Sequence, residues 1–163
     1  MTAVPATATQ TVTATQASDP LALERQVCFA LAVANRGVLA VYRPLLEPMG
    51  LTHPQYLVML ALWGSTEPLS VRRLADLLQL EPATLSPLLK RLEAADFVSR
   101  VRSAGDERQL EITLTPAGRR LRRRAEKIPP AIMATLRVSL DEIETLHRVL
   151  RRFNDAAQQA TAR

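Results

Sequence analysis

The chain has 163 residues, a formal net charge of +5, one cysteine and two histidines. This length and an ordinary apolar content predict one domain with a real hydrophobic core. No apolar run approaches the about 20 residues that span a bilayer, and residues 1–16 carry neither a charged side chain nor a signal-peptide pattern. One cysteine excludes an intramolecular disulfide, and the available ligands are too few for a zinc site. We therefore expect a cytoplasmic protein that needs no metal and no other cofactor.

The charge excess lies in one part of the chain. Between Ser70 and Lys127, 13 Lys and Arg stand against 8 Asp and Glu, whereas the rest of the chain holds 8 of each. A local excess of this kind is expected of a surface that binds a polyanion. A solvated basic surface would give the same count, so charge alone leaves both interpretations open.

The first third of the chain contains a polar tail and two predicted helices. Residues 1–19 are rich in Thr and Ala and are typical of a disordered tail. Apolar residues recur at steps of three and four from Leu21, which predicts an amphipathic helix to about Arg43, ended by Pro44 and Pro48. A second helix is expected from about Pro54 to Trp63, with Thr52 or His53 at its cap.

The basic stretch predicts two short helices followed by two strands. Ser70 is expected to cap a helix over 71–78, and Pro82 lies in the first turn of a helix that runs to about Ala95. The pattern then changes to period two, which predicts strands over 97–102 and 109–114. This order is that of a winged helix-turn-helix, a fold that binds DNA.

The second of these helices has two distinct faces. A core stripe consists of Leu85, Leu88, Leu89 and Leu92. The opposite face carries small, hydroxyl and cationic side chains that suit close contact with bases and phosphates. The residues expected to contact DNA are Thr84, Ser86, Pro87, Lys90 and Arg91. Pro87 forfeits one backbone hydrogen bond and is expected to bend the helix.

The tip of the predicted hairpin supplies a further candidate contact. Arg108 is placed where a wing can enter the minor groove, and Asp106 can fix its guanidinium group. The plainer interpretation is a surface salt bridge in a turn, which is worth little. The element order favours groove insertion.

The last third of the chain is predicted to be helical. Thr115 and Pro116 begin an arginine-rich helix that ends at Pro129 and Pro130, with most of its arginines solvated. Ser139 and Glu142 form a capping box that opens a final helix with one apolar face.

Several blocks of sequence resemble a known family. The segment 69–118 resembles the MarR family of dimeric winged-helix regulators, above all in Asp-Glu-Arg at 106–108 and Leu-Thr-Pro-Ala-Gly at 114–118. The blocks at 26–29, 42–46, 54–57 and 84–91 resemble the one-cysteine type of the organic hydroperoxide resistance regulators, a branch of that family. The resemblance covers about 21–153.

The resemblance implies a mainly α fold with a small β-hairpin wing. It implies a single domain over 20–160, with dimerisation helices at 20–50 and 130–158 and a DNA-binding region at 52–127. A homodimer of this type represses a peroxide-detoxifying gene from an inverted-repeat operator, with two recognition helices about one DNA turn apart. No membrane contact and no enzymatic activity are expected.

The resemblance also assigns a sensor site. Cys28 matches the cysteine that an organic hydroperoxide oxidises, Phe29 flanks it, and Tyr42 matches a tyrosine whose hydroxyl holds the reactive sulfur, usually from the partner subunit. His53 stands where relatives carry a tyrosine, and Ala32 stands at another such position. A protonated His53 can stabilise a thiolate, but His53 can equally just begin a helix.

Alternatives remain at this level. Free cysteines are often buried and inert, and Cys28 is then structural in a repressor that a small aromatic ligand releases. A thiol peroxidase lacks an obvious base and resolving cysteine here, and a pure interaction module would lack salt-dependent DNA affinity. If Cys28 is oxidised, it ends as sulfenate, a cyclic sulfenamide, a Cys28–Cys28 bridge, an over-oxidised acid or, as we favour, a mixed disulfide with a low-molecular-weight thiol.

Overall fold

The computed structural model describes residues 19–102 and 110–161. The chain divides into two compact units, and the division lies between Leu39 and Ala40 in the sequence. The first unit holds the 3-10 helix η2 (Leu23–Arg25) and the beginning of α1 (Val27–Leu46), which continues into the second unit. The helix predicted from Leu21 is therefore wrong at its start, because extended backbone at Gln26 separates η2 from α1. The predicted end at about Arg43 is also wrong, because α1 includes Pro44 and ends at Leu46.

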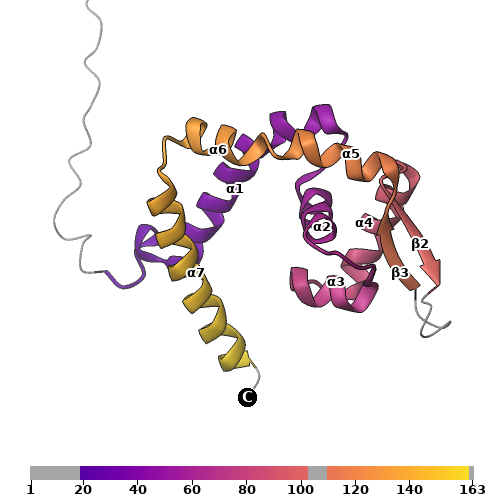
Figure 1. Cartoon of the computed structure of the whole chain (residues 1–163). Coiled ribbons are helices and arrows are strands. Elements are labelled where there is room, and N and C mark those ends of the chain that lie inside the picture. Colours follow the sequence, from indigo (N-terminus) through magenta and orange to yellow (C-terminus); the bar gives the residue numbers. More distant parts are fainter. Residues whose placement is uncertain (1–18, 103–109, 162–163) are drawn as a thin grey trace, which may run out of the picture. The chain divides into compact units, whose positions relative to one another are not determined.

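The second unit contains the remaining elements (Figure 1). They are η3 (Glu47–Met49), α2 (His53–Trp63), β1 (Leu69–Ser70), α3 (Val71–Leu78), α4 (Pro82–Ala94), β2 (Val98–Arg102), β3 (Leu110–Leu114), α5 (Pro116–Ala125), α6 (Ile128–Leu136) and α7 (Leu140–Thr161). The mainly α fold with a small wing is confirmed. The helices α3 and α4 begin where the sequence predicts them, since Ser70 and Glu81 stand at their caps.

The sheet has three strands rather than the two of the predicted hairpin. Its order is β1-β3-β2, and all pairs are antiparallel. β1 contributes only Leu69 and Ser70, which pair with Ile112 and Glu111. A two-residue strand carries no alternating pattern, so the sequence could not reveal it.

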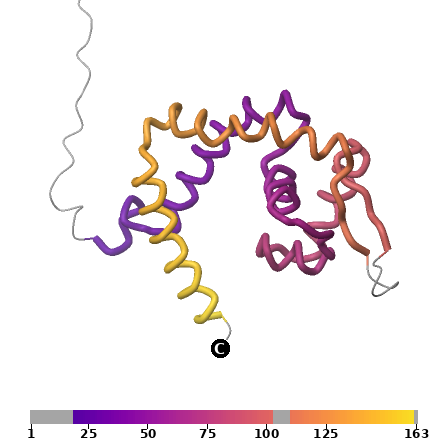
Figure 2. The backbone as a smooth tube through the Cα atoms, viewed as in Figure 1, coloured from indigo at the N-terminus to yellow at the C-terminus, as the bar shows by residue number. Residues whose placement is uncertain are grey.

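The end of the chain contains one helix more than the sequence predicts. Pro129 and Pro130 do not end the arginine-rich helix; they lie in the first turn of a separate helix, α6, where a missing N–H costs nothing. Arg137 ends α6 in the left-handed conformation, with a φ of 54°, and the chain bends there into α7 (Figure 2). The predicted capping box is confirmed, because the Ser139 amide donates to the Glu142 carboxylate at 2.7 Å and the Glu142 amide donates back to the Ser139 hydroxyl at 3.3 Å.

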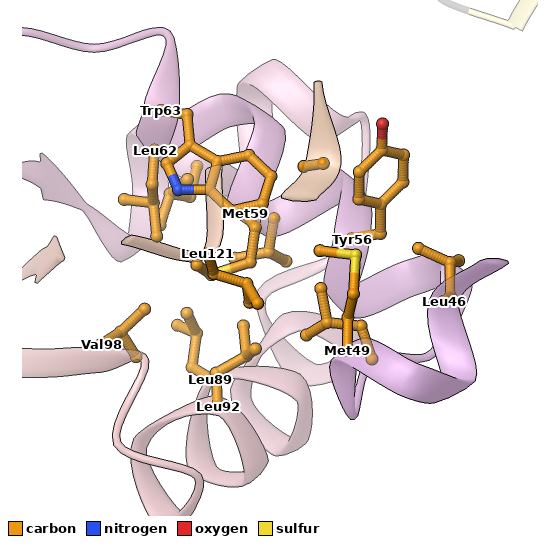
Figure 3. Close-up of a cluster of buried hydrophobic side chains, with 14 of the residues drawn as sticks. Leu46, Met49, Tyr56, Met59, Leu62, Trp63, Leu89, Leu92, Val98 and Leu121 are labelled. Atoms are coloured by element: carbon orange, nitrogen blue, oxygen red, sulfur yellow. The ribbon is translucent and has the colours of Figure 1, made fainter. Parts of the chain in front are cut away.

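The core of the second unit joins α2, α4, the sheet and α5 (Figure 3). Leu85, Leu89 and Leu92 are fully buried, as the predicted stripe on α4 requires, and Leu88 is partly buried. The indole of Trp63 donates to the carbonyl of Gly118 at 2.9 Å. Because a buried indole N–H needs a partner, this bond fixes α5 against the end of α2.

One stretch of the described chain, Val27–Met49, is long and apolar enough to cross a bilayer by length and composition alone. The expectation that no such segment exists was therefore wrong by this criterion. Arg36 and Arg43 lie within the stretch. A helix that packs against protein passes the same test, so the finding by itself does not indicate a membrane protein.

Candidate DNA-binding surface and thiol site

The outer face of α4 is exposed. Pro82 occupies the first turn of the helix, and α4 then runs without interruption through Pro87 to Ala94. The Ser86 hydroxyl donates to the carbonyl of Pro82 at 2.9 Å. All five side chains of α4 that the sequence singled out for DNA contact are exposed: Thr84, Ser86, Pro87, Lys90 and Arg91. They are therefore available to a ligand on the side of α4 opposite its buried leucines.

The turn between α3 and α4 gives the two helices the arrangement of a helix-turn-helix. The Ser70 hydroxyl accepts from the amide of Arg73 at 3.1 Å and so begins α3. Gln79 ends α3 in the left-handed conformation, with a φ of 53°. Leu74 and Leu85 are fully buried, one from each helix. This buried side of α4 fixes which face of the helix is presented outward.

Strands β2 and β3 form the described part of the wing. Val98 lies opposite Leu114 and Arg102 opposite Leu110, and the hydroxyls of Ser99 and Thr113 share a hydrogen bond of 2.8 Å across the pair. The predicted contacts Asp106 and Arg108 lie outside the described residues. Arg102 and Leu110, the described residues on either side of that segment, are paired with each other.

The arginines of α5 are exposed, as the sequence predicts, and three of them also donate to backbone carbonyls. Arg119 donates to the carbonyl of Leu114 at 2.6 Å, and Arg124 donates to that of Pro48 at 2.7 Å. Arg122 donates to the carbonyl of Trp63 at 3.4 Å. These long side chains satisfy backbone carbonyls of neighbouring elements, whereas Leu121 and Ala125 of α5 and Ile128 of α6 are buried.

An ion pair that the sequence does not reveal joins α4 to the wing. The Nε atom of Arg100 on β2 lies 3.0 Å from the carboxylate of Glu93 on α4. No periodicity or capping rule connects a residue near a helix end with one in the middle of the next strand. Only the path of the chain through the α4–β2 turn brings the two side chains together.

The cysteine is accessible in the chain. Cys28 is a free, exposed thiol in the first turn of α1, and the neighbouring Phe29 is partly buried. Both belong to the first unit. Within a single chain, the thiol therefore lies outside the buried core.

Tyr42 and His53 contact each other within the second unit. Their ring centroids lie 5.1 Å apart in an edge-to-face arrangement, and the ring of Tyr56 follows at 6.0 Å from Tyr42. His53 is the first residue of α2, after the capping residue Thr52, whose amide donates to the Gln55 side chain at 2.8 Å. The helix start therefore holds the imidazole against the phenol ring.

Burial shifts the titration of these rings. It lowers the pKa of His53 below the ordinary value of 6.5, and it raises the pKa of Tyr42 above 10.0. Burial thus disfavours the protonated form of the His53 imidazole.

The lowered pKa of His53 predicts a pH-dependent stability. The unfolded chain binds a proton at His53 more readily than the folded chain, so this contribution is present above about pH 6.5 and is lost as the pH falls through the folded pKa. We expect His53→Phe to reduce the loss of melting temperature between pH 7.5 and pH 5. The control is His147→Phe at the exposed His147 of α7; an equal reduction in both variants would contradict the prediction.

Comparisons with known proteins identify the family. The family description "Transcriptional regulator SarA/Rot" matches residues 40–124. The organic hydroperoxide resistance transcriptional regulator of Bacillus subtilis is 38% identical over 132 residues, which are 81% of this chain and 89% of that protein. The HTH-type transcriptional regulator TtmR of Methylorubrum extorquens is 44% identical over 128 residues, 78% of this chain, but the match spans only 65% of TtmR.

Solved structures agree with these relatives. Reduced AbfR of Staphylococcus epidermidis bound to DNA is 33% identical with a TM-score of 0.67, covering 83% of this chain and 94% of AbfR. A disulfide-formed AbfR is 32% identical with a TM-score of 0.58, covering 86% of this chain and 93% of AbfR. The chain thus belongs to the winged-helix transcriptional regulators of the MarR/SarA type, with an organic hydroperoxide resistance regulator among its relatives.

Proposed function

We propose that this transcriptional regulator is a cytoplasmic repressor that organic hydroperoxides release from its operator by oxidising Cys28. The observation that carries the proposal is the exposed thiol at the start of α1 in a chain 38% identical to an organic hydroperoxide resistance regulator. AbfR, which has been solved in reduced and disulfide-formed states, is a further relative in which cysteine oxidation has been captured.

DNA binding in this proposal uses two copies of the chain. Large apolar side chains remain exposed on α1 and α7, among them Leu31, Val33, Leu146, Val149 and Phe153. Covering such side chains is the usual driving force of homodimer formation, since exposed apolar patches favour association. A two-fold dimer then presents one α4 to each half of an inverted repeat.

Each part of the DNA-binding surface has a proposed task. Thr84 and Ser86 supply hydroxyls to base edges and phosphates, Pro87 permits close approach, and Lys90 and Arg91 supply cations. Arg108 enters the minor groove with Asp106 fixing its guanidinium group. The surplus of five positive charges between Ser70 and Lys127 adds long-range attraction to the phosphates.

The sensing reaction uses the thiol and one hydroperoxide. Sulfur attacks the terminal oxygen of ROOH, the O–O bond breaks, and the products are a Cys28 sulfenic acid and the alcohol ROH. A low-molecular-weight thiol then displaces water to give a mixed disulfide. Tyr42 of the second copy donates its hydroxyl to the reactive sulfur, and His53 supports that ring through their edge-to-face contact.

A band-shift titration tests the proposal. Purified protein is titrated against DNA from upstream of its own gene and a scrambled duplex at fixed salt, with and without cumene hydroperoxide. We expect tight, sequence-dependent binding that the hydroperoxide reverses, with Cys28 modified in the released protein by intact-mass spectrometry. An unmodified Cys28 in released protein would refute the redox step. Release by an aromatic acid alone would favour the ligand-gated alternative, and sustained turnover of hydroperoxide would favour a peroxidase.

The cationic face of α4 yields a separate prediction. If Lys90 contacts a phosphate, Lys90→Ala should weaken binding to all sequences and reduce the slope of log K against log salt by about one. Lys127→Ala is the matched control, because it removes the same charge from an exposed residue at the cap of α6. Equal slopes for the two variants would contradict a phosphate contact at Lys90.

A further inference from the structure

We propose that Glu93 and Arg100 are positioning residues that hold the wing at a fixed angle to α4. Neither side chain needs to touch a base for this role. The inference rests on the proposed use of α4 and the wing in DNA binding, and it adds that operator recognition depends on an internal ion pair between them.

The contact itself is specific. Arg100 Nε and a carboxylate oxygen of Glu93 lie 3.0 Å apart, within ion-pair distance, with side chains that are 29% and 42% exposed. The Nε atom is buried and has no hydrogen bond within the described residues, so the Glu93 carboxylate is the charge that compensates it there. A buried donor that loses its partner keeps the full cost of its desolvation. Removing the Glu93 carboxylate therefore favours a conformation in which the Arg100 side chain reaches solvent.

The sheet explains why an arginine reaches this place. Side chains alternate along a strand, so Arg100 shares a face of β2 with Val98. Val98 is buried, and Ile112, which lies opposite Arg100 on β3, is fully buried. Arg100 thus leaves the strand on its inner face and extends to the end of α4 rather than to solvent.

Backbone contacts hold the base of the wing. The amide of Phe97 donates to the carbonyl of Leu92 at 3.0 Å, and the amide of Thr115 donates to the carbonyl of Phe97 at 3.2 Å. The Thr115 hydroxyl donates to the carbonyl of Asp96. These bonds fix where β2 begins.

The sheet also orients the wing, because β3 pairs with β1 and Ile112 is fully buried. The ion pair adds a direct side-chain attachment between β2 and α4. Arg100 lies two residues beyond Val98, about 7 Å farther along β2 at the usual rise per residue. The pair with Glu93 therefore acts on the strand beyond its anchored base. It restrains β2 from the α4 side, in addition to the pairing of β2 with β3.

Two simpler interpretations make different predictions. A partly exposed ion pair can contribute almost nothing, in which case neutralising Glu93 has no specific effect. Arg100 can instead be a phosphate ligand that Glu93 weakens, in which case neutralising Glu93 strengthens binding and removing Arg100 lowers the salt slope by about one. A positioning pair predicts weaker operator recognition without a change of slope.

The experiment compares four proteins by fluorescence anisotropy: the wild type, Glu93→Gln, Arg100→Gln and the charge-exchanged double variant Glu93→Arg/Arg100→Glu. The probes are a duplex from upstream of the protein's own gene and a scrambled duplex of equal composition, at several salt concentrations. Glu126→Gln is the matched control, because it removes the same charge from the exposed Arg122–Glu126 pair of α5 and its C-terminal cap, with both side chains more than half exposed.

We expect each single variant to lower the ratio of operator to scrambled affinity about fivefold to tenfold, as loss of one charge-assisted contact would. The salt slope stays unchanged, and the double variant recovers most of the ratio. Hydrogen exchange of the β2 amides should also quicken in Glu93→Gln. If a single variant melts well below the wild type, its specificity ratio is replaced by this exchange measurement, taken at a temperature where it remains folded.

Three outcomes overturn the inference. Glu93→Gln that behaves like Glu126→Gln shows that the pair has no role in positioning. Arg100→Gln with a reduced slope shows a phosphate contact instead. Unchanged exchange of the β2 amides shows that the wing does not depend on the pair. If the wild-type protein binds both duplexes equally, the proposed operator binding is refuted, and this result differs from a failure of the positioning role alone.

Discussion

Gly118→Ala is expected to destabilise the protein by about 3 kcal/mol, enough to unfold a marginally stable domain. A Cβ atom at Gly118 would lie 2.0 Å from the carbonyl oxygen of Phe97, a distance that no side chain adopts without movement of the backbone. The obstacle is backbone and not the end of a flexible side chain. The start of α5 and the α4–β2 turn must therefore separate to admit a methyl group.

The damage from this substitution should extend beyond Gly118. The carbonyl of Gly118 accepts the indole N–H of buried Trp63, so a displaced α5 also leaves that donor without its partner. The turn that moves is the one from which the wing begins. We therefore expect Gly118→Ala to lose operator binding together with stability, and both are measured on the same preparation by urea unfolding and band shift.

Gly64→Ala is the matched control for Gly118→Ala. Gly64 follows α2 with a φ of −83°, and the nearest atom to a Cβ there is the Leu60 carbonyl oxygen at 3.4 Å. An alanine fits this conformation without backbone movement, so its unfolding free energy should stay within about 1 kcal/mol of the wild type. Equal stability of the two variants would contradict the close approach of Gly118 to Phe97.

Cys28→Ser is expected to abolish the response to organic hydroperoxide while leaving operator binding intact. Couplings between a regulatory event and binding typically amount to about 1–3 kcal/mol, so oxidation should weaken the wild type about 5- to 150-fold. The serine hydroxyl does not form a sulfenic acid, and this weakening should disappear. The side chain is exposed in α1 and far in sequence from α4, so the reduced proteins should bind DNA equally.

The control for Cys28→Ser is Ala30→Ser, which places a hydroxyl at a neighbouring exposed position of α1 and keeps the thiol. It should respond to hydroperoxide as the wild type does. A Cys28→Ser protein that hydroperoxide still releases would refute the sensor role. Full release of that variant by an aromatic acid would assign the regulator to the ligand-gated class.

The predictions from sequence were most accurate where the signal is local. The bounds of α3 and α4 follow from the caps at Ser70 and Glu81 and from leucines at helical spacing. The predictions from sequence failed where the deciding interaction is not local. Pro44 looks like a helix end, but α1 continues to Leu46, and the Pro129–Pro130 pair looks like a break although it opens α6. Proline marks a boundary only if its position in the turn is known.

At the candidate site, too, local features were predictable from the sequence and contacts between segments were not. The exposed face of α4 was predictable because helical periodicity assigns every residue a side. The contact between Tyr42 and His53 was not, because it depends on how α1 and α2 approach each other across η3. The lowered pKa of His53 follows from that burial, so the direction of this shift could not be predicted from the residue type.

The sequence by itself determined that this protein has a helix-turn-helix with a basic, polar outer face and one cysteine at the start of a long helix. Caps, prolines and periodic leucines act over a few residues, and their effects can be read along the chain. Only the tertiary structure decided the third strand, the arginines of α5 on backbone carbonyls, the approach of Gly118 to Phe97 and the Glu93–Arg100 pair. Each of these depends on how separate segments pack, and packing is settled by the shape of the whole core rather than by any one segment.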